Sequence, residues 1–181
     1  MFEKRAEEMA RKNNHEIRDP MYAFIHLDSE ERQVLNSVSV QRLRHIHQFA
    51  LTYLVCPGAT HRRFEHSPGV MELATRIYDI VVNTSSPDVL EIDGDYEKEY
   101  YRRTVRMAAL VHDIGHAPFS HASEDLFPPA RDHEAMTLRL IESEEMERLW
   151  KRLRMSSISV RCSTPTSVSA CPARTRISLT T

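Results

Sequence analysis

The stretch HDIGHAPFSH, residues 112–121, places three histidines and an aspartate directly after the apolar segment 107–111. Burying imidazole and carboxylate groups costs several kcal/mol unless they are paired with one another or bind a metal ion. The neighbours His112 and Asp113 offer one nitrogen and one oxygen ligand. Ligands of this mixed type suit Mg, Mn, Fe or Zn, so we expect a divalent metal site here without being able to choose the ion.

Two residues predict how the chain turns at this point. Gly115 is expected to end the preceding helix in a left-handed conformation, and Pro118 is expected to prevent the helix from resuming. The turn then aims His112, Asp113 and His116 into one pocket.

A second cluster lies upstream, in the sequence HRRFEHS at residues 61–67. His66 can supply a third ligand, and Arg63 carries the planar, doubly donating guanidinium that phosphates favour. The alternative for Arg63 is a surface arginine beside Glu65. For the histidines of both clusters, the alternative to chemistry is a hydrogen-bonded structural role.

The sequences RFEHS (63–67), HDIGH (112–116) and PFSH (118–121) together resemble the HD-domain superfamily. Within it they are most similar to the deoxynucleoside triphosphate triphosphohydrolases. Gln48 and the sequence PGAT at 57–60 also agree with that family. The similar region spans about residues 19–150.

The resemblance implies a role for each site residue. The implied set comprises the metal ligands His66, His112 and Asp113, the substrate contacts Arg63 (phosphate) and Gln48 (sugar), and the catalytic histidines His116, His121 and His133. His121 is expected to be the acid, because a histidine can protonate a leaving oxygen near neutral pH. In the family a further aspartate far downstream completes the metal set, and neither Asp125 nor Asp132 matches it. We therefore expect three protein ligands and a poorly occupied site.

The resemblance implies hydrolysis of a deoxynucleoside triphosphate (dNTP) to the deoxynucleoside and inorganic triphosphate, impaired by a missing C-terminal half. Two alternatives stay open. One is an HD-type phosphohydrolase acting on another nucleotide or phosphoester, and the other is an inactive fragment or nucleotide-binding regulatory module. The expected partner is the nucleotide substrate, and the family also suggests a homo-oligomer.

The composition favours an all-α fold, since the chain has only four glycines and its apolar residues mostly follow helical spacing. We expect an HD-domain helical bundle with one short N-terminal β-hairpin or strand near residues 21–27. Three segments are predicted: a lead-in helix at 1–18, the N-terminal part of the HD domain at 19–154, and a disordered tail at 155–181. Twelve of the 27 tail residues are Ser or Thr, which suggests the hypothesis of an altered reading frame.

Within the domain, the apolar spacing and the cap residues predict five individual helices. The first is capped by Asp28 or Ser29 and runs to about residue 36, and the others lie at 40–54 after Ser39, 68–82 after Ser67, 96–113, and 133–154. Pro68 is expected at the first position of its helix, which would leave His66 outside it. The residues Val70, Leu73, Ile77, Ile80 and Val81 share one apolar face of that helix.

The bulk properties exclude several classes of protein. The net charge of −2 creates no global field that would attract nucleic acid. No apolar run approaches the roughly 20 residues needed to cross a bilayer, and the N-terminus lacks a signal-peptide core. We therefore expect a cytoplasmic protein without a membrane partner.

Overall fold

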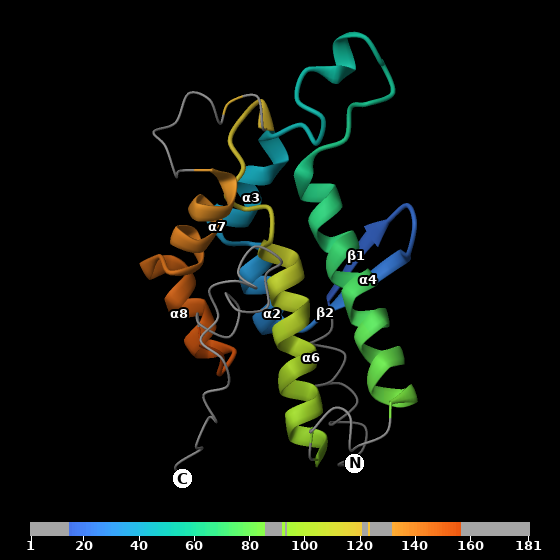
Figure 1. The fold of residues 1–181 in the computed structure, drawn as a ribbon, viewed down its shortest axis with the longest axis vertical. Coiled ribbons are helices and arrows are strands. Elements are labelled where there is room, and N and C mark those ends of the chain that lie inside the picture. Colours follow the sequence, from blue (N-terminus) through green and yellow to red (C-terminus); the bar gives the residue numbers. More distant parts are fainter. Residues whose placement is uncertain (1–14, 86–91, 93, 121–122, 124–131, 157–181) are drawn as a thin grey trace, which may run out of the picture.

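The computed structural model describes residues 15–85, 92, 94–120, 123 and 132–156 (Figure 1). An antiparallel hairpin comes first, and helices make up nearly all the remaining regular structure. The elements are β1 (His15–Asp19), β2 (Ala23–Leu27), α2 (Ser29–Leu35), α3 (Val38–Gln41), α4 (Arg63–Thr84), α6 (Gly94–Val111), α7 (His133–Ile141), α8 (Glu144–Arg152) and the 3₁₀-helices η1 (Arg42–His45) and η2 (Thr52–Leu54). The prediction of an all-α fold with a short N-terminal hairpin is confirmed.

The long helices α4 and α6 lie side by side and run in opposite directions at the centre of the molecule (Figure 1). Met71 of α4 and Met107 and Leu110 of α6 are completely buried in the core. Because the two helices are antiparallel, the first turn of α4 lies beside the end of α6. Both histidine clusters are thereby brought to the same end of the helix pair.

A buried ion pair fixes the hairpin and α2 against this helix pair. The Arg106 guanidinium donates to both carboxylate oxygens of Glu31, at 2.7 and 3.1 Å. It also donates to Thr75 Oγ1 and to the carbonyl oxygen of His26, each at 2.8 Å. One side chain of α6 therefore binds groups from β2, α2 and α4.

Of the two caps predicted for α2, the structure selects Asp28. The Asp28 carboxylate accepts hydrogen bonds from the backbone N–H groups of Glu30 and Glu31 at 2.8 and 2.7 Å. The Glu31 carboxylate in turn accepts from the Asp28 N–H at 3.2 Å. This reciprocal capping box satisfies donors that the first helical turn would otherwise leave unpaired.

The predicted helix over residues 40–54 is wrong. The first helical stretch ends at His45, Ile46 adopts an extended conformation, and helical structure returns only in the short 3₁₀-helix η2. The Ile46 carbonyl accepts from the Arg63 N–H at 2.9 Å, and the His61 carbonyl accepts from the Gln48 N–H at 3.1 Å. Pairing with residues far along the chain therefore replaces the local helical bonds, and the segment between forms a loop. In the same region, α3 begins after Ser37 rather than Ser39.

Helix α4 begins five residues before the predicted start at Pro68, so the expectation that His66 lies outside the helix is also wrong. The pairing of Arg63 with Ile46 and the bond from the Arg62 N–H to the Glu65 carboxylate (3.2 Å) fix the earlier start. Pro68 is then the sixth helical residue, where it costs one backbone hydrogen bond near the helix end.

The apolar face of α4 predicted from the sequence points outward. Leu73, Ile77, Ile80 and Val81 are 47%, 53%, 62% and 41% exposed. The opposite face, which includes Phe64, Met71 and Thr75, packs against the core. The apolar spacing was recognised, but local periodicity cannot show which of two partly apolar faces meets the rest of the fold.

The predicted last helix begins as expected, with the Asp132 carboxylate accepting from the Ala135 N–H at 2.8 Å. It is not continuous, however, because α7 ends at Ile141 and Ser143 caps a separate helix, α8. The break lets α8 fold back so that Trp150 Nε1 donates to the Ile141 carbonyl at 2.9 Å.

Two of the predicted segments, 1–18 and 155–181, lie mostly outside the described residues. Residues 15–18, which we placed in a lead-in helix, form strand β1, where alternate side chains are more exposed. Residues 1–14 and 157–181 lie outside the described part of the chain. Among the residues that the structure describes, no helix has both the length and the apolar character needed to cross a membrane.

Candidate metal centre

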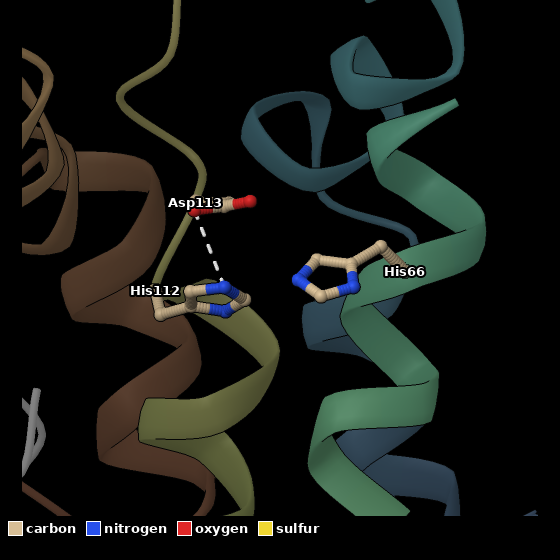
Figure 2. A group of neighbouring side chains, drawn as sticks. All are labelled: His66, His112 and Asp113. Carbon is tan, nitrogen blue, oxygen red and sulfur yellow. Dashed lines mark ion pairs between the residues drawn. The ribbon is translucent and has the colours of Figure 1, made fainter. Parts of the chain in front are cut away.

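Three side chains meet where the first turn of α4 lies beside the end of α6 (Figure 2). His66 comes from α4, and His112 and Asp113 come from the turn after α6. One potential ligand atom from each residue lies within 4.8 Å of the others. The two imidazole rings face each other across the gap between the helices, with their centroids 5.3 Å apart. The structure thus brings together the three residues expected as metal ligands.

The turn that presents His112 and Asp113 depends on Gly115, but not in the way we predicted. Among the described glycines only Gly94 has a positive φ, so Gly115 does not adopt the left-handed conformation. A Cβ atom at Gly115 would instead clash with the His133 carbonyl and the Thr137 backbone nitrogen. Glycine is required because the turn packs directly against the start of α7.

Thr137 of α7 also holds this turn. Its hydroxyl oxygen accepts from the Gly115 N–H at 3.0 Å, and the hydroxyl donates to the His112 carbonyl at 3.3 Å. We did not predict Thr137 from the sequence, because nothing distinguishes it from other threonines on a helix. Its role is visible only once α7 is packed against the turn.

A hydrogen bond to the backbone sets which nitrogen of His112 faces the site. Nδ1 lies 2.7 Å from the Ala109 carbonyl oxygen, which can only accept, so Nδ1 donates to it. Nε2 is left to face the site, and it lies 3.2 Å from Asp113 Oδ1. An imidazole nitrogen beside a carboxylate oxygen is a ligand pair that fits a divalent cation.

The other oxygen of Asp113 is bound by Arg63. Arg63 Nη1 donates to Asp113 Oδ2 at 2.5 Å, and Nη2 donates to Ser120 Oγ at 2.5 Å. Burial acts to raise the pKa of Asp113, but the neighbouring His112, Arg63 and His116 together lower it by more, so the carboxyl pKa lies below its usual range. Asp113 is therefore a carboxylate at neutral pH, as a metal ligand must be.

His66 is also in the protonation state that metal binding needs. Burial lowers the pKa of His66, and the neighbouring His112 lowers it further. A lowered pKa keeps the ring neutral near pH 7, with a lone pair available to a cation.

Two of the predicted catalytic histidines lie next to the ligand set. His116 Nε2 is 3.6 Å from Asp113 Oδ1, and the His116 ring stacks on His133 with 4.0 Å between centroids. Gln48 contacts Arg63, since its backbone carbonyl accepts from Arg63 Nη2 at 3.5 Å. His121 lies outside the described residues.

Sequence reasoning also missed Ser120 and Arg42. Ser120 is the second partner of Arg63, and Arg42 donates to the carbonyl of Ile114 in the turn after Asp113. Arg42 belongs to the sequence QRLR at 41–44, which agrees with the resembled family, so this motif was an available signal. No sequence signal indicated a role for Ser120 beyond its place next to His121.

A model of the HD domain matches residues 63–159, more than half of the chain. The chain belongs to the HD-domain family. The metal ligands that the resemblance implied lie inside the matched region, as do the helices α4, α6, α7 and α8 that carry or support them. The HD-domain architecture predicted from the sequence is therefore confirmed.

Curated relatives of this HD-domain chain include characterised and uncharacterised proteins. An uncharacterised protein of Methanocaldococcus jannaschii is 44% identical over 108 residues, covering 60% of this chain and 20% of the relative. Deoxynucleoside triphosphate triphosphohydrolase SAMHD1 of Danio rerio is 40% identical over 111 residues, covering 61% of this chain and 17% of the relative. The matched part of the chain thus corresponds to about a fifth of the length of each relative.

Solved structures resemble the HD-domain chain over most of its length. A phosphohydrolase from Bacteroides thetaiotaomicron matches with a TM-score of 0.63 and 31% identity, covering 82% of this chain and 34% of that one. A hypothetical protein from Aquifex aeolicus matches with a TM-score of 0.60 and 28% identity, covering 88% and 42%.

Proposed function

We propose that the candidate metal centre is the site of a metal-dependent phosphohydrolase that converts dNTPs to the deoxynucleoside and inorganic triphosphate. The observation that carries this proposal is the convergence of His66, His112 and Asp113 beside Arg63. The Bacteroides phosphohydrolase supports the reaction class. The zebrafish relative, whose name states dNTP triphosphohydrolysis, supports the substrate class.

The three ligands would hold a divalent ion, which when bound neutralises phosphate charge and lowers the pKa of a water. The chain prepares this site in advance. The bond from His112 Nδ1 to the Ala109 carbonyl orients the ring, and such outer hydrogen bonds commonly matter 10–100-fold for metal affinity. Three protein ligands leave coordination positions open for water and substrate.

The remaining polar residues suit a triphosphate substrate. Arg63 supplies a permanent positive charge at the site, and a guanidinium matches phosphate oxygens with two parallel donors. The stacked pair of His116 and His133 lies beside Asp113, where a proton donor for the leaving 5′ oxygen is needed. We assign that donor role to His121 with support from His116 or His133, and we assign the sugar contact to Gln48.

The proposal is tested by incubating the protein with each of the four dNTPs and Mn²⁺ or Mg²⁺, and separating the products by anion-exchange chromatography. We expect inorganic triphosphate, at a rate that His66→Ala lowers at least about 100-fold because a ligand is lost. His45→Ala, an exposed histidine outside the site, is the matched control and should leave the rate unchanged.

Other products would select the alternatives. Release of pyrophosphate or single phosphate would indicate an HD-type phosphohydrolase of a different substrate class. Nucleotide binding without any turnover would contradict the enzymatic proposal and indicate a regulatory module.

A further inference from the structure

The Asp113 carboxylate is shared between two sets of partners. Its Oδ1 faces the imidazole nitrogens of His112 and His116, at 3.2 and 3.6 Å. Its Oδ2 accepts from Arg63 Nη1 at 2.5 Å, and the side chains of Arg63 and Asp113 are only 5% and 11% exposed. A fixed guanidinium therefore lies directly against a candidate metal ligand, away from the screening effect of water.

This pairing changes the charge balance of the site. Asp113 is the one anionic member of the three-residue ligand group. Arg63 neutralises that charge, and the two remaining ligands are imidazoles, which carry no negative charge. A divalent cation entering the group would meet no net negative charge, and its Coulomb repulsion from Arg63 is larger at a buried site than in water.

We propose that Arg63 competes with the metal ion for Asp113, and that an oxyanion bound at the site relieves this competition. The inference rests on the proposed function of the same site. If an oxyanion takes over the guanidinium, the full charge of Asp113 becomes available to the cation. Because coupling between two ligands is reciprocal, the metal should also strengthen oxyanion binding.

The other contacts of Arg63 are consistent with such an exchange. Within the described part of the chain, Asp113 is its only charged partner, since Nη2 binds the neutral Ser120 hydroxyl and the more distant Gln48 carbonyl. Its Nε is buried, and no described residue offers it a hydrogen-bond acceptor. An oxyanion can therefore replace Asp113 as the charged partner and also use a donor that the protein leaves unused.

A purely positioning role for Arg63 predicts the opposite change in metal affinity when Arg63 is removed. If Arg63 served only to hold Asp113 in position, removing it would weaken metal binding, as the loss of outer partners commonly does. Competition predicts that removing the positive charge strengthens metal binding. We favour competition because Arg63 brings a full charge to the only anionic ligand, whereas the orientation of that ligand is already restrained by the turn after α6.

The test is Mn²⁺ affinity measured by isothermal titration calorimetry on the metal-free protein. We expect Arg63→Gln to bind Mn²⁺ about tenfold more tightly than the wild type, and Arg63→Lys, which keeps the charge, to show no such gain. Arg62→Gln, the adjacent arginine without an ion pair in the described structure, is the matched control and should not change the affinity. Equal or weaker binding by Arg63→Gln would overturn the competition.

A second measurement needs no variant at this buried position. Sulfate should tighten Mn²⁺ binding to the wild type relative to chloride at the same ionic strength, and an absence of this gain would overturn the coupling. Failure of the proposed function gives different results. Without a metal centre, Mn²⁺ would bind to neither the wild type nor Arg63→Gln, and with another substrate class the products of the dNTP incubation would change while these Mn²⁺ affinities would not.

Discussion

Asp113 and Gly115 show how single residues define the site. The two oxygens of Asp113 have different partners, so the carboxylate joins the histidine cluster to Arg63. Two residues later, Gly115 lets the same turn press against α7. The position of Asp113 therefore depends on the absence of a side chain at Gly115 as much as on the groups that bind it.

A substitution at Gly115 tests this dependence. Gly115→Ala would push a methyl group into the backbone of α7, and overpacking of this kind costs about 1–3 kcal/mol or more. We expect a lower melting temperature and weaker Mn²⁺ binding, measured by thermal denaturation and calorimetry. Gly58→Ala is the matched control, because no atom lies within 4 Å of its added Cβ, and it should leave both unchanged. Equal stability of the two variants would contradict the packing argument.

At the scale of elements, the site depends on the register of α4 against α6. His66 and His112 face each other only because the first turn of α4 meets the end of α6. The buried network around Arg106 holds this register, since it joins α6 to Glu31, to Thr75 and to the backbone of β2. Removing one member of a buried ion pair leaves the other charged and unpaired.

Arg106→Met should therefore destabilise the fold by about 3–5 kcal/mol, because Glu31 would remain buried without its partner. Arg102→Met on the same helix is the matched control. Its ion pair with Asp79 is about a third exposed, so its loss should cost at most about 1 kcal/mol. Chemical denaturation measures both free energies of unfolding, and similar values for the two variants would contradict the assigned importance of the Arg106 network.

At the scale of the whole molecule, local signals were predictable and long-range pairings were not. The start of α2 was predictable to within one residue, because Asp28 and Ser29 are both capping residue types and the structure selects Asp28. The predicted helix over 40–54 failed because Ile46 pairs with Arg63, seventeen residues away. The buried face of α4 could not be read from its apolar spacing for the same reason: packing against α6 and the hairpin decides it, and local periodicity does not.

The grouping of His66, His112 and Asp113 was predictable because residue type and motif spelling carry the information. The motifs around His66 and His112 indicated that these three side chains meet, although they lie far apart in the sequence. The roles of Thr137 and Ser120 required the packed structure, since each acts through a contact with a distant segment. The pairing of Arg63 with Asp113 also required the packed structure. From the sequence, Arg63 was assigned to the substrate phosphate instead.

The most direct test of the account is the stoichiometry of Mn²⁺ binding, measured by calorimetry on the wild type, His66→Ala and the control His45→Ala. The account predicts one site per chain in the wild type and in His45→Ala, and loss of that site in His66→Ala. If His66→Ala bound Mn²⁺ with the same stoichiometry and affinity as the wild type, the ion would not lie between α4 and α6, and the proposed site would be wrong.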